Sequence, residues 1–195
     1  MKRFLALIAA VALLAPFNGL AATYSLDPAH SSIEFKVKHL MIANVKGVFE
    51  KFKGTVFIDD KDISKSKVDV TIEMASVNTN IAKRDDHLRS PDFFDAAKFP
   101  TMTFVSTKVE SAGADKLKVT GNLTIKGVTK AVVLDVEGPT GEIKSPQGDI
   151  KRGASATAKI NRQDFGVSWS KKLDGGGLVV AEDVFISIDT EMFKK

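Results

Sequence analysis

The residues whose types most suggest chemistry lie in RDDHLRSPDFFDAAKFP, residues 84–100. Asp85, Asp86 and His87 are residue types that act as general acids and bases, and such groups must reach one reacting atom. Neighbouring residues of a helix point in different directions, so these three groups do not converge if the segment is helical. The spacing therefore favours a structural role over a catalytic one.

Two arginines, Arg84 and Arg89, flank this cluster, and their role is open. In one interpretation the arginines and carboxylates tie the segment to the rest of the protein. In the other, an arginine binds an anionic head group, because guanidinium groups recognise phosphate well.

The other two histidines are isolated in the sequence. His39 extends the alternating row Ile33, Phe35 and Val37, so it either orients the polar head of a ligand or hydrogen-bonds the rim of the fold. His30 lies in LDPAHS and is expected to stabilise that turn. Because the chain has no HxH or HxxxH pair and no cysteine, neither a metal nor another cofactor is predicted.

The elements that must position these residues are strands. Most of the chain alternates apolar and polar residues with a period of two, which is typical of strands that are apolar on one face. The first apolar row continues from His39 to Met41. The rows after it are Val68, Val70, Ile72 and Met74; Met102 and Phe104; Leu117, Val119, Leu123 and Ile125; Val132, Leu134 and Val136; Ala154, Ala156, Ala158 and Ile160; and Val184, Ile186 and Ile188. Residues 47–58 are also strand-like, but Val48 and Phe49 break the alternation, which predicts a bulge.

The short connections between these segments predict the topology. Turn-like stretches such as SAGAD and KGVT favour sequential hairpins. About eight antiparallel strands hide their edges most simply by closing into an up-and-down barrel, and a two-sheet sandwich is the alternative. We therefore expect an all-β fold, an eight-stranded antiparallel β-barrel with a short helical insertion.

The insertion lies between two barrel strands, in the region of residues 80–100. Asn80 is expected to cap a first helix, and Ser90 a second helix with Pro91 at its first position. Such an insertion can only lie over an end or an outer wall of the barrel. The apolar residues expected to dock it are Phe93, Phe94 and Phe99.

The interior of an eight-stranded barrel is either filled by side chains or holds one small ligand. Several inward positions are small, namely Ala154, Ala156, Ala158 and Gly121, which leaves volume for an extended apolar ligand. Alternatively, large neighbours such as Phe104 fill these gaps. The periodicity alone leaves both interpretations open.

The N-terminus has the order of a secretory signal peptide: the charged residues Lys2 and Arg3, the apolar run of residues 4–17, and small residues before a cleavage site. We expect cleavage after Ala21, with Ala22 as the alternative site, so residues 1–21 are the predicted signal peptide. The apolar run is short for a membrane span, which makes a retained anchor the weaker interpretation.

The mature chain, residues 22–195, has the length of one ordinary domain. Loss of Lys2 and Arg3 lowers its formal net charge from +4 to +2, and the basic residues are spread evenly, which argues against nucleic-acid binding. No later stretch is long and apolar enough to span a bilayer, so no stable membrane anchor is predicted. Without cysteine, an exported fold must rely on its core alone.

Four segments carry a resemblance to a known family. YSLDPAHSSIEFKVKHLMIANVKGVFEKFKG, KRDDHLRSPDFFDAAKFPTMTF, GNLTIKGVTK and NRQDFGVSW occur in this order and together resemble the YceI-like family of bacterial periplasmic proteins, also called polyisoprenoid-binding proteins. The resemblance covers the mature chain from Tyr24 to near the C-terminus. It implies a lipocalin-like extended barrel whose apolar pore holds a polyisoprenoid or similar long-chain amphiphile, and it implies a homodimer. Isoprenoid quinone transport or storage and a stress response are the roles it suggests.

This resemblance favours the hollow barrel and a protein that binds without catalysing. The pore lining is then predicted to include Phe35, Val37, Phe104, Leu123 and Trp169. The candidates for binding the ligand head group at the mouth are His39, Arg84, His87 and Arg89. Two alternatives remain: an enzyme on an apolar substrate with His39 or His87 as acid or base, and a filled barrel that acts through its outer surface.

Overall fold

The computed structural model describes residues 21–195, so the predicted signal peptide lies outside the described residues except for Ala21. The strands are β1 (Ala22–Leu26), β2 (Ser32–His39), β3 (Ala43–Phe49), β4 (Phe52–Ile58), β5 (Lys67–Glu73), β6 (Val77–Asn78), β7 (Thr101–Gly113), β8 (Lys116–Ile125), β9 (Val128–Glu137), β10 (Ile143–Lys144), β11 (Ile150–Asn161) and β12 (Val180–Lys194). The helices are α1 (Ala82–Arg89) and the short 3₁₀ turns η1 (Pro28–His30), η2 (Ile63–Lys65), η3 (Met74–Ser76) and η4 (Arg162–Phe165).

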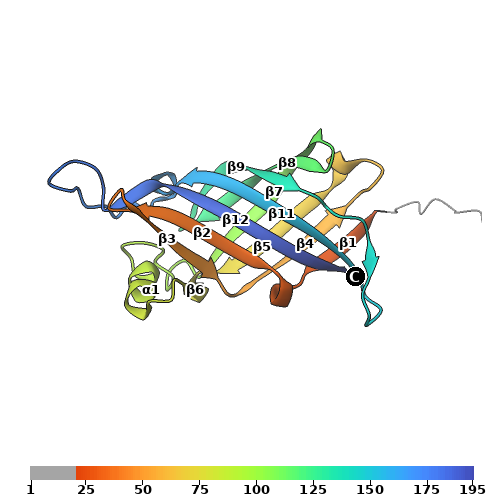
Figure 1. The fold of residues 1–195 in the computed structure, drawn as a ribbon, viewed down its shortest axis with the longest axis horizontal. Coiled ribbons are helices and arrows are strands. Elements are labelled where there is room, and N and C mark those ends of the chain that lie inside the picture. The colour runs from red at the N-terminus through yellow and green to blue at the C-terminus, as the bar shows by residue number, and fades with distance from the viewer. Residues whose placement is uncertain (1–20) are drawn as a thin grey trace, which may run out of the picture.

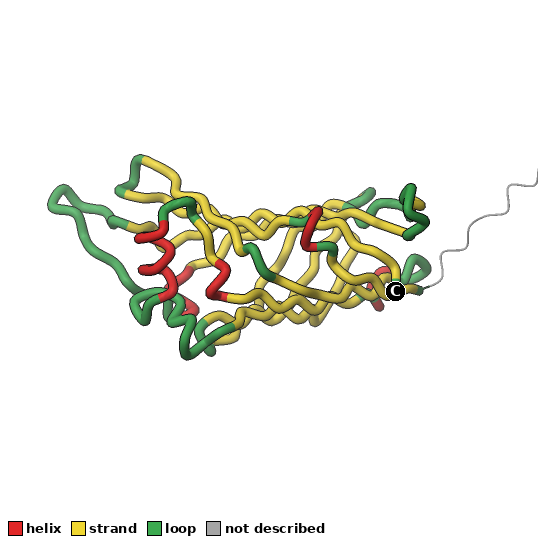
Figure 2. Tube along the Cα trace, turned by 90° about the horizontal axis from the view of Figure 1, so that it is seen from below, coloured by secondary structure: helices red, strands yellow, loops and turns green. Residues whose placement is uncertain are grey.

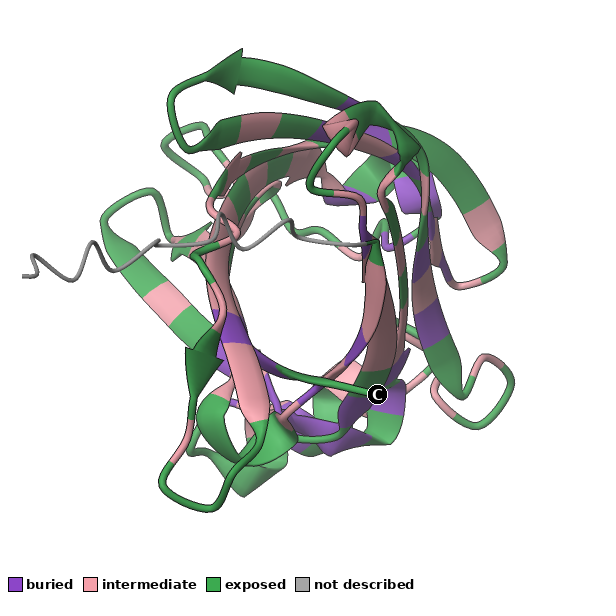
Figure 3. Ribbon diagram, turned by 90° about the vertical axis from the view of Figure 1, so that its right-hand side faces the viewer, coloured by how far each residue is buried: buried purple, intermediate pink, exposed green. Residues whose placement is uncertain are grey.

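Eight of these strands close into a ring. The order around it is β1, β4, β5, β7, β8, β9, β11 and β12, and β12 pairs again with β1, all antiparallel. Figure 3 shows this ring from the end at which the C-terminus lies. The predicted eight-stranded antiparallel barrel is confirmed, and the sandwich alternative is wrong because β11 and β12 join the two sides of the sheet into a closed wall.

The barrel wall extends beyond the ring at one end. Strand β12 pairs with β1 at one end of its edge and with β2 along the rest, and β2 then pairs with β3, which pairs with β6. The strand pairs β1/β2, β3/β4 and β5/β6 are thus interrupted strands. This extension carries α1 and lies opposite the C-terminus (Figure 1).

The predicted bulge at Val48 and Phe49 is instead a complete break in the strand two residues later. The backbone N–H groups of Glu50 and Lys51 donate to the carbonyl and hydroxyl oxygens of Ser76, each at 3.1 Å, rather than to a neighbouring strand. The break lets β3 pair with β2 and β6 while β4 pairs with β1 and β5. A local loss of alternation cannot distinguish a bulge from such a change of partners.

The hairpins β7–β8 and β8–β9 confirm the predicted sequential connections. The second uses Lys126 and Gly127, both at positive φ, as the tight turn of a twisted hairpin requires. The β2–β3 turn differs, since its positive-φ residues are Leu40 (51°) and Met41 (62°). The strand predicted to continue to Met41 therefore ends at His39, because this turn begins directly after it. A side chain with a Cβ costs roughly 1 kcal/mol in this conformation, so this turn is strained.

The insertion contains one helix, and the predicted second helix is wrong. Asn80 does not cap α1: it adopts a positive φ of 63°, and its N–H donates to the Asn78 side chain at 2.8 Å, so the helix starts after Ile81. Ser90 ends α1, because its hydroxyl donates to the His87 carbonyl at 2.8 Å. The Ser90 carbonyl then accepts from the N–H groups of Phe93 and Asp95, which forms a turn where a helix was expected.

Candidate functional site

An apolar cavity of about 400 Å³ runs inside the barrel. Its wall is formed by the inward faces of the strands, and one end is lined by α1 and the turn after it (Figure 2). Wall residues include Ile33, Ile72, Met102, Val119, Leu134, Ile186 and Ile188. This volume is within the range of about 300–1,000 Å³ that is usual for small-molecule sites.

Large side chains fill the space beside some of the small inward residues, and other small residues leave space open to the cavity. At Gly121 the Phe104 ring occupies the space of a Cβ, and at Gly47 the Phe35 ring does the same, so large residues fill these gaps. On β11, by contrast, Ala154 and Ala156 face the cavity directly. The aromatic rings therefore fill the interior beside Gly121 and Gly47, while space stays open beside Ala154 and Ala156.

The five residues predicted to line a pore all lie on the cavity wall: Phe35 and Val37 from β2, Phe104 from β7, Leu123 from β8 and Trp169 from the loop before β12. Their alternation in the sequence placed the first four. Trp169 follows η4 outside any strand, so only the fold brings it to the cavity.

We call the α1 end of the cavity the mouth, and His39, Arg84 and His87 line it. The His87 ring packs edge-on against the rings of Phe93 and Trp169, with centroids 4.9 and 5.4 Å apart. Its Nε2 lies 3.0 Å from Asp92 Oδ2, so a carboxylate orients the imidazole. The rings of Phe93 and Trp169 thus flank the histidine, and the two rings offer apolar surface to a lipid chain that passes through the mouth.

The fourth head-group candidate, Arg89, does not line the cavity. Its guanidinium donates to the carbonyls of Ala75 and Val77 at 2.9 and 3.0 Å, and to Asp86 at 3.0 Å. These bonds tie α1 to η3 and to β6, so Arg89 positions the helix.

Arg84 points toward the cavity and is anchored through Thr79. Its Nε and Nη2 donate to the Thr79 hydroxyl and carbonyl at 2.7 and 2.8 Å. The buried Asp85 carboxylate accepts from the Thr79 N–H at 2.8 Å and from its hydroxyl at 2.5 Å. Asp85, Asp86 and His87 therefore have three separate partners, and no reacting atom lies within reach of all three.

The opposite end of the cavity, which we call the deep end, is packed with side chains. Tyr24, Ile58 and Met192 are at most 2% exposed there. Arg152 makes a bidentate ion pair with Asp60 at 2.8 and 2.6 Å, and it lies over the Tyr24 ring. Among the residues that line the cavity within residues 21–195, His87 at the mouth is the exposed one, which makes the mouth the end at which we expect a ligand to enter.

Two hydrogen bonds to Glu142 extend this network. The Tyr24 hydroxyl donates to Glu142 at 2.5 Å, and Lys194 donates to the same carboxylate at 2.8 Å. Burial, together with the bond to Glu142, raises the pKa of Tyr24 from 10.0 to about 12. The hydrogen bonds from Lys194 and Tyr24 lower the pKa of Glu142.

The charged residues of this network were not predicted from the sequence to be part of a site. Asp60, Glu142 and Arg152 lie in loops or on strands with ordinary polar neighbours, and Arg152 is separated from Asp60 by 92 positions. Arg162, also missed, is buried and donates to the carbonyls of Val167, Val180 and Ala181, which holds the loop that carries Trp169. A signal was available for Arg162, because it follows an alternating strand directly and stands four residues before a glycine, Gly166.

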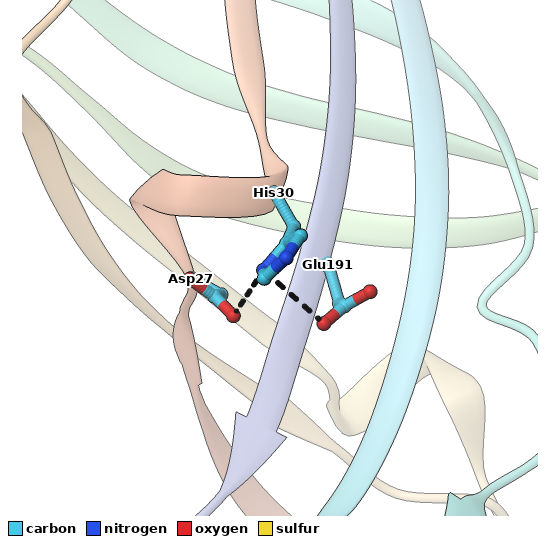
Figure 4. A group of neighbouring side chains, drawn as sticks. All are labelled: Asp27, His30 and Glu191. Atoms are coloured by element: carbon cyan, nitrogen blue, oxygen red, sulfur yellow. Dashed lines mark hydrogen bonds and ion pairs between the residues drawn. The ribbon is translucent and has the colours of Figure 1, made fainter. Parts of the chain in front are cut away.

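One cluster outside the cavity has metal-ligand residue types. Asp27, the residue that caps η1, comes together with His30 of η1 and Glu191 of β12 (Figure 4), with His30 Nδ1 2.9 Å from Asp27 Oδ2 and 3.7 Å from Glu191 Oε1. The ammonium of Lys151 already lies 2.6 Å from Glu191 and 3.4 Å from Asp27. This lysine supplies the positive charge, and the hydrogen bond from His30 lowers the pKa of Asp27. The cluster is therefore an ion-pair network that holds the turn, which confirms the expectation for His30.

Helices that cross membranes must be long and apolar, and none within residues 21–195 meets that requirement.

Comparison with known proteins gives consistent results. A model of the YceI-like domain matches residues 24–192. A UPF0312 protein of Photorhabdus laumondii is 40% identical over 190 residues, which cover 96% of each chain. The crystal structure of a YceI protein from Campylobacter jejuni is 40% identical with a TM-score of 0.69, over 81% of this chain and 90% of that one. A polyisoprenoid-binding domain from Saccharophagus degradans shares the fold at 17% identity, with a TM-score of 0.62 over 89% and 99% of the two chains.

Proposed function

Because this chain belongs to the YceI-like family, we propose that it is a periplasmic protein that binds a polyisoprenoid or a similar long-chain lipid inside its barrel. The observation that carries the proposal is the apolar cavity, which is packed at the deep end and reaches the α1 end of the barrel. The name of the Saccharophagus degradans domain, which describes a polyisoprenoid binder on the same fold, supports this ligand class.

The energetics of such a site favour long chains. Burial of each methylene group is worth about 0.8 kcal/mol, so chain length supplies affinity without many polar contacts. The rings of Phe104 and Phe35 and the row that contains Ala154 and Ala156 give an apolar wall of varied depth. This wall suits a branched isoprenoid chain, in which methyl groups alternate with slender segments.

Selectivity for the head group would come from the mouth. Arg84 uses Nε and Nη2 to bind Thr79, and its Nη1 has no hydrogen-bond partner among residues 21–195. We assign Arg84 as the group that binds an anionic or carbonyl head, with His39 and His87 beside it. Arg89 is fully engaged with backbone carbonyls and acts through the position of α1.

The site binds and releases without chemistry, because the acidic and basic groups of the mouth do not converge on one point. An enzyme that used His87, oriented by Asp92, would need a second group opposite it. The biological setting that we propose is transport or storage of isoprenoid quinones or related lipids in the periplasm, as part of a stress response and as a homodimer.

Native mass spectrometry of the mature protein purified from periplasm, followed by lipid extraction, tests the proposal. We expect a stoichiometric isoprenoid or long-chain adduct. Ala156→Phe places a ring in the cavity and should abolish the adduct, whereas Thr157→Phe, on the exposed face of the same strand, should leave it unchanged. A clean apo mass, combined with no rise in melting temperature upon addition of quinones or prenyl phosphates, would contradict the proposal.

A further inference from the structure

The turn between β2 and β3 exposes three large apolar side chains in a row. Leu40, Met41 and Ile42 are 38%, 49% and 81% exposed. The other exposed large apolar residues of the described chain have no such neighbours in sequence; Ile81 precedes α1, and Phe185 lies under the ammonium groups of Lys36 and Lys159. A contiguous apolar tip differs from such scattered residues, because contiguous exposed apolar surface marks interaction sites.

The backbone conformation of this turn does not explain its apolar residues, because other residue types would stabilise the same conformation better. Leu40 and Met41 both adopt positive φ, where asparagine and glycine are preferred. The β8–β9 turn of the same barrel has the preferred glycine at the second position, Gly127. The β2–β3 turn thus keeps Leu40 and Met41 at positions where they strain the backbone, although more than a third of each side chain is exposed.

A second segment lies beside this turn. The Leu40 N–H donates to the Val179 carbonyl at 2.8 Å, and Met41 approaches Gly177. The loop that contains Gly177 projects beyond the barrel at the same end as α1 (Figure 1). We call residues 40–42 together with residues 171–178 the docking tip.

The charge around the docking tip is positive. Residues 36–49 contain three lysines and no acidic residue, and residues 166–181 contain two lysines and one aspartate. Lys38, Lys171 and Lys172 are exposed, and within residues 21–195 none of them forms an ion pair. An apolar tip beside unpaired lysines complements the apolar interior and the phosphates of an anionic lipid surface.

We propose that the docking tip places the barrel mouth on a bilayer that contains anionic lipids. Leu40, Met41 and Ile42 enter the head-group region, and Lys38, Lys171 and Lys172 lie among the phosphates. The mouth is adjacent, because His39 directly precedes the turn and lines the cavity. The inference rests on the proposed function for its purpose, since a carrier must load at a membrane, but docking itself needs no ligand in the cavity.

Co-sedimentation of the purified mature protein with vesicles tests this surface. We expect binding to phosphatidylcholine vesicles that contain phosphatidylglycerol, weaker binding to phosphatidylcholine alone, and a decrease in high salt. Ile42→Ser should lower binding to both kinds of vesicle by roughly tenfold, because it removes one buried aliphatic side chain. Its control is Ile143→Ser, which changes a 62% exposed isoleucine that pairs with Lys151 at the deep end and should have no effect.

Two further variants separate the contributions. Lys171→Gln/Lys172→Gln should weaken binding to phosphatidylglycerol vesicles by roughly tenfold and leave phosphatidylcholine binding unchanged. Leu40→Asn/Met41→Gly should raise the melting temperature, because these residues suit the positive-φ turn, and should still lower vesicle binding. A more stable protein that binds membranes less cannot be explained by misfolding.

Several outcomes would overturn the inference. Binding that is equal for the wild type, Ile42→Ser and Leu40→Asn/Met41→Gly would do so, as would the absence of vesicle binding by the wild type. Conversion of a dimer to a monomer by Ile42→Ser in sedimentation velocity would show that the tip is a subunit interface. A short prenyl phosphate in solution, monitored by the only tryptophan, Trp169, reports on the cavity separately. Uptake without docking overturns this inference alone, and docking without uptake overturns the proposed function.

Discussion

The two ends of the barrel are built from different interactions. At the deep end, distant strands are joined by side chains that bond to one another, namely Arg152 with Asp60 and Tyr24 with Glu142. At the mouth, Arg84 and Arg89 bond mainly to Thr79 and to backbone carbonyls that are at most fourteen residues away in the sequence. The polar contacts of the deep end therefore join residues far apart in the chain, whereas those of the two arginines at the mouth are local.

The largest effect that tests this difference is expected at Arg152, which is 7% exposed. Arg152→Met leaves Asp60 without its partner and should lower the free energy of unfolding by about 3 kcal/mol, the low end for a broken buried pair because Asp60 is 30% exposed. Urea denaturation measures this loss. Arg152→Met/Asp60→Asn removes the unpaired charge and should recover part of it. A loss below about 1 kcal/mol for the single variant would mean that the pair does not hold the deep end.

The next effect is a dependence on alkaline pH. The pKa of Tyr24 is about 12 in the folded protein and 10.0 when exposed, so the folded state resists loss of the proton. Its contribution is complete below pH 10 and is lost as the pH rises to 12, an effect on the order of 2 kcal/mol. Because Tyr24 is the only tyrosine, ultraviolet absorbance of the phenolate reports its titration directly.

Tyr24→Phe is the matched control for this effect. The variant should lose less stability than the wild type over the same interval, measured by urea denaturation at each pH. If the absorbance change occurs near pH 10, Tyr24 is not protected by burial and Glu142, and the deep end is more open than its packing indicates.

A smaller and more local effect is expected at the mouth. Asp85→Ala removes the acceptor for two Thr79 hydrogen bonds and should cost about 1.5 kcal/mol. Hydrogen exchange should show faster exchange in residues 79–99 and unchanged protection in the deep end. Faster exchange throughout the barrel would instead show that the insertion and the ring unfold as one unit, and the contrast between the ends would fail.

The smallest effect distinguishes the two arginines of the mouth. Arg84→Gln should weaken binding of a prenyl phosphate relative to the matching prenol by about fivefold, because one charge-assisted hydrogen bond is lost. Arg89→Gln should weaken both ligands alike, since Arg89 acts only through the position of α1. Competition for Trp169 fluorescence measures both ratios. Equal selectivity in the wild type and in Arg84→Gln would remove Arg84 from the head-group site.

The candidate site was only partly predictable from the sequence. Phe35, Val37, Phe104 and Leu123 could be placed on the inner wall because alternation defines one face of a strand. Arg84 and Arg89 could not be distinguished, because both lie in one polar segment and only the contacts of α1 show that Arg89 bonds to the carbonyls of Ala75 and Val77. The error at Ser90 has a similar origin, since the same hydroxyl can begin a helix or end one.

The amino-acid sequence by itself determined most of the strands and their inward faces, though not β1, together with the hairpins around Lys126 and SAGAD and the position of the insertion. These features depend on residues that are close in the chain, and period-two patterning and turn residues report them directly. Only the tertiary structure decided which end of the barrel is packed and that β3 and β4 take different partners. Asp60 and Arg152 are separated by 92 positions in the sequence, and β12 pairs with β1, β2 and β11 when the ring closes. Such contacts depend on the path of the whole chain, so local sequence patterns do not report them.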